Sequence, residues 1–157
     1  PDHHSVLVDL GPRSNIVGSR TQRAFAERAI MYGHIPVYHT RKSRLNFNGA
    51  GAGSAPCDEE AAMPIAIRGD GDVAKVDTFR ANIAEGSGAD LPAIVGPTSM
   101  QEKDSVIILI EGKEQLVFLG PGGYNIEWNP KTSIRPMTSA PPGHLVIPCD
   151  HFENAVT

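Results

Sequence analysis

The sequence has little cysteine and few aromatic residues: two cysteines, one tryptophan, three tyrosines and five phenylalanines among 157 residues. So few cysteines favour reduced thiols over a disulfide framework, and their spacing matches no metal-binding motif. We therefore expect a cytoplasmic protein with no metal and no other cofactor. The 16 glycines and 13 prolines favour short strands and frequent turns over a helical bundle.

Long hydrophobic runs and an excess of positive charge are also missing. No stretch approaches the roughly 18 apolar residues of a membrane span, and the N-terminus lacks a secretory signal pattern. The formal net charge of −4 gives no reason to expect nucleic acid or a membrane as a partner. The single basic cluster, Arg41-Lys42-Ser43-Arg44, is interpreted as a solvated loop or, alternatively, as a substrate-side or nucleic-acid patch. The length predicts a single domain over residues 1–157.

The most informative motif that is present is Asp9-Leu10-Gly11, which directly follows the apolar run Val6-Leu7-Val8. A strand that ends in an acid at a tight turn places the carboxylate at the edge of a sheet. Loops at such edges are where functional sites are commonly built. The motif therefore predicts a candidate site centred on Asp9.

The remaining pattern predicts a mostly β chain with two helices. The first helix is predicted over 20–32, with Ser19 as its cap and Ala24, Phe25, Ala29 and Tyr32 on its apolar face. The second is predicted over 97–103, capped by Thr98 or Ser99. Strands are predicted over 6–8, 35–38, 57–67, 73–83, 91–96, 106–110, 115–119, 124–128, 134–137 and 143–148.

Two further patterns concern glycine. The alternation of glycine and small residues from Gly49 to Gly53 predicts a mobile hairpin tip between two extended segments. An apolar run also reaches a glycine twice, at Ile16-Val17-Gly18 and at Ile94-Val95-Gly96, and a predicted helix follows each. This weak internal similarity is typical of the two halves of a pseudo-symmetric barrel.

In their order, these features resemble the retropepsin-like aspartic proteases encoded in retrotransposon polyproteins, most closely those of copia-type elements. The resemblance covers nearly the whole chain. It rests on the segments Leu7–Gly11, Gly49–Gly53, Asp90–Gly96, Leu119–Gly123 and Pro142–Cys149. It implies a mostly β, closed-barrel acid-protease fold with one or two short helices, and an aspartic endopeptidase of the polyprotein-processing type.

The resemblance also implies a role for individual residues. Asp9 matches the catalytic aspartate, and the active-site loop continues through Leu10, Gly11 and Pro12. The substrate-binding flap is matched by Gly49, Ala50, Gly51, Ala52 and Gly53, and the supporting strand by Ile94, Val95 and Gly96. Hydrolysis by aspartates needs two carboxylates that share a proton, and this chain offers one such motif. The implied enzyme is therefore a homodimer that binds an extended peptide or polyprotein.

A second hypothesis belongs to a different class. Leu10 stands where the family has a hydroxyl residue that forms hydrogen bonds across the dimer, and Pro12 stands where a small residue is usual. The alternative is therefore a retropepsin-like fold that no longer cleaves and serves as a structural or protein-binding module. A metal site at His3 and His4 lacks a third ligand at a recognisable spacing, so we expect both side chains to be solvated.

Overall fold

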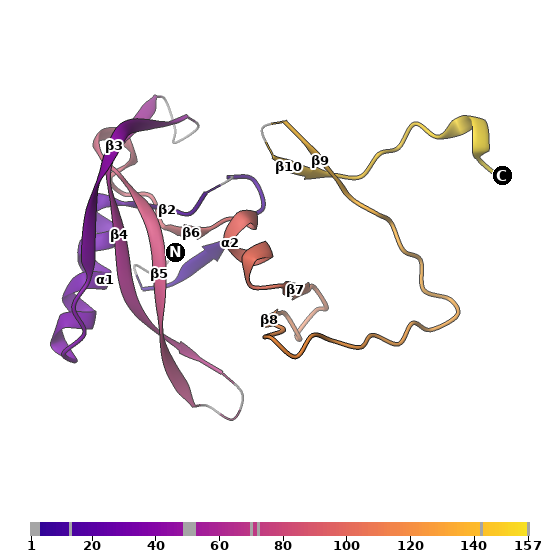
Figure 1. Ribbon diagram of the computed structural model, residues 1–157, viewed down its shortest axis with the longest axis horizontal. Coiled ribbons are helices and arrows are strands. Elements are labelled where there is room, and N and C mark those ends of the chain that lie inside the picture. The colour runs from indigo at the N-terminus through magenta and orange to yellow at the C-terminus, as the bar shows by residue number, and fades with distance from the viewer. Residues whose placement is uncertain are drawn as a thin grey trace.

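The computed structural model describes residues 4–12, 14–48, 53–69, 71, 73–141 and 143–156. Its main body is a six-stranded sheet in the order β1-β6-β2-β5-β4-β3, accompanied by two separate hairpins (Figure 1). This arrangement confirms the mostly β class. The strands are β1 (Val6–Val8), β2 (Ile16–Gly18), β3 (Val37–Asn48), β4 (Ser54–Arg68), β5 (Ala74–Ala84), β6 (Ala93–Val95), β7 (Ser105–Ile108), β8 (Gln115–Phe118), β9 (Thr138–Ala140) and β10 (His144–Val146). The helices are α1 (Ser19–Met31) and α2 (Pro97–Glu102), with short 3-10 turns at Gly86–Gly88 and Phe152–Asn154.

The three long strands β3, β4 and β5 form an antiparallel meander. In β4 the side chains of Ala55, Cys57, Ala61 and Met63 are all buried. These positions have the same parity because successive side chains of a strand point to opposite faces of the sheet. The predicted strands over 57–67 and 73–83 correspond to β4 and β5. The strand predicted over 35–38 is much longer in the structure, where β3 continues to Asn48.

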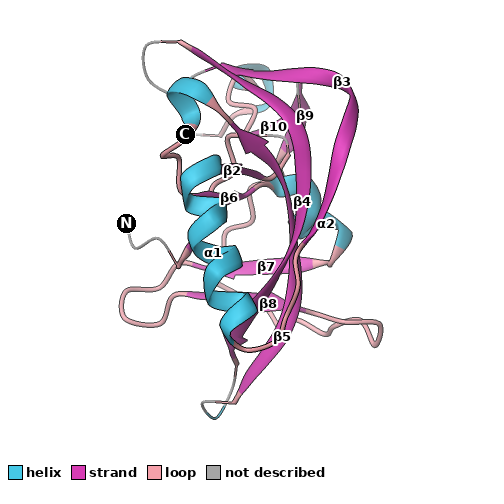
Figure 2. Ribbon diagram, turned by 90° about the vertical axis from the view of Figure 1, so that its left-hand side faces the viewer, coloured by secondary structure: helices cyan, strands magenta, loops and turns pink. Residues whose placement is uncertain are grey.

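Helix α1 covers one face of this sheet (Figure 2). Its buried residues are Thr21, Gln22, Phe25 and Ala26. The predicted face is therefore wrong at its C-terminal end, since Tyr32 is 66% exposed and lies beyond the last helical residue. Two of the four buried residues, Thr21 and Gln22, are polar. Gln22 has a hydrogen-bond partner in its buried position, since its Nε2 donates to the Tyr38 hydroxyl at 2.6 Å.

Both helices begin directly after a glycine. Gly18 is the N-cap of α1 and Gly96 is the N-cap of α2, and neither helix has a side-chain cap. The predicted caps are therefore wrong. Ser19 is already helical, and Pro97 occupies the first position of α2, where a missing N–H leaves no hydrogen bond unmade.

The two Ile-Val-Gly segments lie next to each other in the sheet. Strands β2 and β6 are antiparallel and pair at Ile16 and Ile94. Each strand then leads into its helix through the capping glycine. The weak repeat in the sequence thus has a structural counterpart: two strand–helix units face each other at the centre of the sheet.

The core is built from residues between 16 and 100. Among the described residues, none after Met100 is buried. Two neighbouring apolar clusters make up this core. The first contains Val17, Phe25, Ala61, Met63, Phe79, Ala81, Ile83 and Ala93, and the second contains Ile16, Ala55, Cys57, Ala84 and Ile94.

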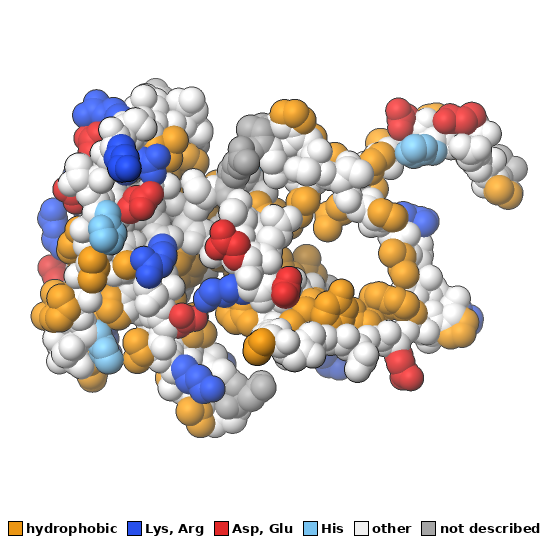
Figure 3. Space-filling view, in the orientation of Figure 1, with side chains coloured by type: hydrophobic (Ala, Val, Ile, Leu, Met, Phe, Trp, Pro, Cys, Tyr) orange, Lys and Arg blue, Asp and Glu red, His pale blue; other side chains and the backbone are white. Residues whose placement is uncertain are grey.

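The C-terminal segment from 119 to 156 extends away from the sheet as a long arm (Figures 1 and 3). Its strand pairing in the described residues is the β9–β10 hairpin. The strands predicted over 124–128 and 134–137 are wrong because neither range is in a described strand. Trp128 is 59% exposed, so it takes no part in the core. The described helices include none with the length and apolar character needed to cross a membrane.

Candidate active site

Asp9 is the first residue after β1. Strand β1 runs parallel to β6, with Val8 opposite Val95. The hydrogen bonding extends one residue further, since the Asp9 N–H donates to the Val95 carbonyl at 3.1 Å. The chain leaves the sheet here, which places a half-buried carboxylate at the end of a strand as the sequence predicts.

Gly11 orients this carboxylate. Its backbone N–H donates to Asp9 Oδ1 at 2.8 Å. A Cβ at position 11 would lie only 3.1 Å from the same oxygen, which is tighter than ordinary contact. Glycine two residues after the acid therefore lets the backbone close over the carboxylate. Within the described residues no other hydrogen bond holds the Asp9 carboxylate, so it remains available to an incoming group.

The neighbours of Asp9 form an apolar rim. Leu10 is 44% exposed, and Leu7 and Val8 on β1 are exposed to a similar extent. Gly11 is also exposed, whereas Pro12 is half-buried. Strand β1 is the outermost strand of the sheet order, so its described residues pair on one side only. The site is therefore an acid at an exposed apolar sheet edge.

The predicted supporting strand lies directly beside this loop. Ile94 is buried, Val95 is half-buried and Gly96 is buried. Strand β6 separates β1 from β2 and pairs with both. It therefore contacts the chain on each side of the loop that carries Asp9.

The predicted flap is described only at its last residue. Positions 49–52 lie outside the described residues, and Gly53 is exposed. Both arms are defined up to the pair Asn48 and Ser54, which are opposite each other in the antiparallel ladder. The described arms on either side of the segment are thus paired as an antiparallel hairpin.

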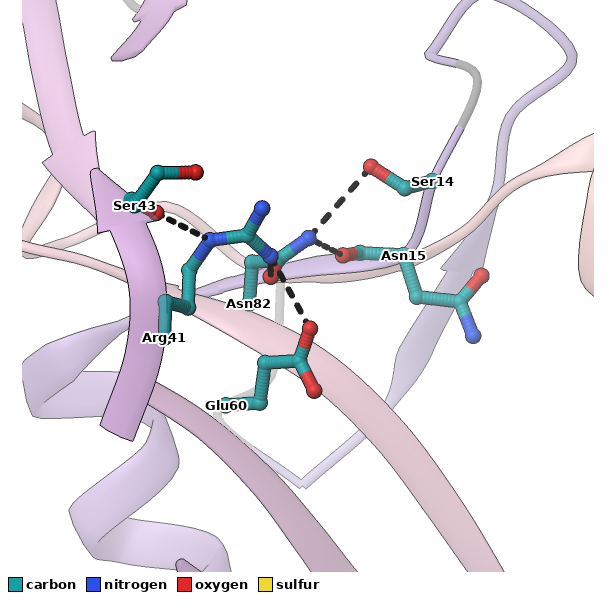
Figure 4. A network of polar contacts seen from close by, with 6 residues as sticks. All are labelled: Ser14, Asn15, Arg41, Ser43, Glu60 and Asn82. Atoms are coloured by element: carbon teal, nitrogen blue, oxygen red, sulfur yellow. Dashed lines mark hydrogen bonds and ion pairs between the residues drawn. The ribbon is translucent and has the colours of Figure 1, made fainter. Parts of the chain in front are cut away.

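A polar network behind the loop was not anticipated from the sequence (Figure 4). Asn15 donates to the Arg80 carbonyl on β5, Asn82 donates to the Asn15 carbonyl, and Arg41 contacts Asn82. The available signal was Asn82 itself, a polar residue within the short run from Ala81 to Ala84, whose other members are apolar. A buried amide in such a run requires hydrogen-bond partners.

Asp90, the two cysteines and His3 are further side chains of chemically reactive types. The Asp90 carboxylate is held by Arg20 at 2.6 Å, in an exposed ion pair. Both cysteines are free, and burial raises the pKa of the Cys57 thiol, which disfavours the nucleophilic thiolate. His3 lies outside the described residues, and no group of three metal-ligating side chains occurs in the described part of the chain.

An open groove of about 1090 Å³ lies between the long strands and the β7–β8 hairpin. Its apolar walls include Ile65, Phe79, Val95 and Leu116. Asp9 is not part of this lining, although the groove reaches Val8 before it and Ser14 and Asn15 after it. Comparison with known proteins adds no assignment, because no protein-family model and no curated protein sequence matches the chain.

Proposed function

We propose that this chain is one half of a homodimeric aspartic endopeptidase of the retropepsin type, with one catalytic Asp9 per chain. The supporting observation is the Asp9 carboxylate itself, which stands at the end of β1 with one oxygen held by the Gly11 amide. The proposed enzyme processes polyproteins in the cytoplasm and closes its sheet into a barrel-like domain.

The chemistry requires a second carboxylate. Two carboxyl groups at short distance cannot both ionise, so the pair shares one proton. The ionised member takes a proton from the attacking water, and the neutral member donates to the carbonyl oxygen of the substrate. Because this chain supplies one Asp-x-Gly motif, the second carboxylate comes from Asp9 of the partner subunit.

The exposed edge supports association of two copies. Leu7, Val8 and Leu10 are each more than 40% exposed around Asp9. Burying this apolar rim against its equivalent in a second copy removes it from water and brings the two carboxylates together. The β3–β4 hairpin then provides an arm for each half of the site, and an extended peptide binds by main-chain hydrogen bonds.

A structural or protein-binding module is the second candidate, and Leu10 is the observation that favours it. An exposed leucine cannot form the hydrogen bonds that a hydroxyl residue makes across the dimer of the resembled family. The same apolar rim is equally suited to bind another protein without cleaving it.

The deciding experiment combines peptide cleavage at mildly acidic pH with sedimentation to determine the oligomeric state. The Asp9→Asn variant is expected to lose activity on the order of 10⁴-fold, because the dyad loses its ionisable pair. Asp90→Asn is the matched control and is expected to retain activity, since Asp90 pairs with Arg20 on the surface. Activity that survives Asp9→Asn rejects the protease, and a stable dimer that cleaves nothing favours the module.

A further inference from the structure

One peptide unit fastens both ends of the loop that carries Asp9. At the start of the loop, the Asp9 N–H donates to the Val95 carbonyl at 3.1 Å. At its end, the Gly96 N–H donates to Asn15 Oδ1 at 2.8 Å. The Val95 carbonyl and the Gly96 N–H belong to the same peptide group. The Asn15 side chain therefore closes the loop against the point at which Asp9 leaves the sheet.

Asn15 is in turn fixed by strand β5. Its Nδ2 donates to the Arg80 carbonyl at 2.9 Å, so both ends of its carboxamide are bound. The Asn82 N–H donates to the Asn15 carbonyl at 3.1 Å. The Asn82 side chain adds longer contacts from its Nδ2 to Ser14 Oγ (3.4 Å) and to the Asn15 carbonyl (3.5 Å).

Arg41 determines which way the buried Asn82 carboxamide points. Arg41 Nη1 donates to Asn82 Oδ1 at 2.6 Å and to Glu60 Oε1 at 2.9 Å (Figure 4). A guanidinium has only donors, so it can face only the oxygen of the amide. The amide nitrogen is thereby directed toward Ser14 and Asn15.

The position of Arg41 links the network to the hairpin. Arg41 lies where β3 departs from its regular pairing with β4, between Thr40 and Leu45. Its Nε also donates to the Ser43 carbonyl at 3.1 Å, which holds the irregular segment in place. A continuous series of hydrogen bonds thus runs from β3, across β5, to the loop of Asp9.

We propose that Arg41, Asn82 and Asn15 are positioning residues, which hold the loop of Asp9 in register and couple it to the β3–β4 hairpin. The catalytic consequence of this inference rests on the proposed protease function. In the part of the chain that the structure describes, none of the three residues forms a hydrogen bond with the Asp9 carboxylate, so they act through the backbone that carries it.

The experiment compares Arg41→Gln with Arg44→Gln in the full chain by NMR and hydrogen exchange. Arg44 is the matched control, because it lies in the same irregular segment but pairs with Asp58 at 2.8 and 3.0 Å and not with the loop. In Arg41→Gln, the Gly96 amide is expected to exchange about tenfold faster and the Gly11 amide resonance to shift. In Arg44→Gln, both are expected to stay unchanged. Core amides such as that of Ala81, measured in the same samples, report whether the fold persists.

The conservative variant Arg41→Lys tests whether a positive charge at this position is enough to keep the Gly96 amide in slow exchange. Both contacts to Asn82 and Glu60 come from the single atom Nη1, so a lysine ammonium can replace it. Arg41→Lys is therefore expected to restore slow exchange at Gly96. Where peptide cleavage is measurable, Arg41→Gln is expected to lower kcat about tenfold, per active site, with little change in KM.

The outcomes separate the two proposals. If the wild-type chain cleaves nothing, the protease proposal fails, whereas the exchange and resonance data still decide the positioning role. The positioning role is rejected if Arg41→Gln leaves the Gly96 exchange rate and the Gly11 resonance at their wild-type values. It is also rejected if Arg44→Gln changes them equally, or if Arg41→Lys, in a chain that folds, fails to restore them.

Discussion

At the residue scale, Gly11 determines how the Asp9 carboxylate is oriented. The Gly11 N–H fixes Asp9 Oδ1, and the absence of a Cβ makes that approach possible. The residue between them, Leu10, contributes only apolar surface. The local geometry of an acid held by a backbone amide is thus present without the hydroxyl that normally accompanies it in the resembled family.

Gly18 is a second position where a single residue is constrained by its surroundings. A Cβ there would lie 2.4 Å from the Ala89 carbonyl oxygen and 2.6 Å from the Leu91 nitrogen. Both atoms belong to the backbone and cannot rotate away. Gly18→Ala is therefore expected to lower the free energy of unfolding by about 3 kcal/mol, as measured by urea denaturation.

Gly122→Ala is the control for that substitution, because a Cβ at position 122 meets nothing within 4 Å and its φ is not positive. Its stability is expected to stay within about 0.5 kcal/mol of the wild type. Equal effects of the two substitutions would show that the close approach at Gly18 is absent in solution.

At the scale of elements, the basic cluster of the sequence is an irregular segment stabilised by ion pairs. Arg41 pairs with Glu60, and Arg44 forms a bidentate pair with Asp58. The hydrogen bond from Arg44 holds the pKa of the Asp58 carboxyl below its usual range. The interpretation as a solvated loop is therefore only partly correct, since the two arginines are engaged within the sheet.

Asp77 connects two elements that are distant in sequence. It lies on β5, accepts the Thr78 N–H at 2.7 Å, and accepts Lys103 Nζ, just after α2, at 3.2 Å. These bonds, the Thr78 amide first, lower the pKa of the Asp77 carboxyl. A lowered folded-state pKa contributes stability that is fully present above the unfolded value, near 3.9, and is lost as the pH falls through the folded value.

The wild-type chain is expected to lose free energy of unfolding between about pH 5 and pH 2, and Asp77→Asn is expected to lose less over the same range. The measurement is the free energy of unfolding of both chains at each pH. Lys103→Gln is expected to retain most of that loss, because the Thr78 amide is the larger cause of the lowered pKa. An Asp77→Asn variant with the full wild-type pH dependence would contradict the assignment.

Short elements whose ends are marked by glycine or acidic residues could be predicted from the sequence. The strand at 6–8 and the helices near 20–32 and 97–103 lie within two residues of β1, α1 and α2. Strand β3 was predicted too short because its polar residues from His39 to Arg44 show no apolar alternation. The pairing of His39 and Thr40 with β4, and the ion pairs that Arg41 and Arg44 form with it, stabilise the strand instead. The strand predicted over 124–128 does alternate, but it has no described partner strand.

At the scale of the molecule, the sequence predicted the central acid and its glycine but not what holds them. Asp9 and Gly11 lie two positions apart, so the hydrogen bond between them depends on local backbone geometry alone. Asn15, Arg41 and Asn82 are brought together by strand pairing over up to 67 residues of chain. No local pattern encodes these long-range contacts, so only the polar residue Asn82 between Ala81 and Ile83 pointed to them.

The molecule consists of a packed body and an exposed C-terminal arm. No described residue after Met100 is buried, and the exposed arm carries Tyr124, Ile126 and Trp128 with more than 40% of their surface accessible. Cleavage of a folded chain by a protease requires local unfolding of about ten residues around the bond, which costs little where backbone and side chains are unpaired.

Trypsin is therefore expected to cut after Lys131 at least about 100-fold faster than after Arg80, which lies within β5. Both side chains are exposed, so the difference in rate measures backbone pairing and not access to the side chain. The fragment that ends at Lys131 is expected to keep the free energy of unfolding of the full chain within about 1 kcal/mol, because the core residues all precede it. Equal cleavage rates at Lys131 and Arg80, read by mass spectrometry over time, would show that the arm is packed in solution.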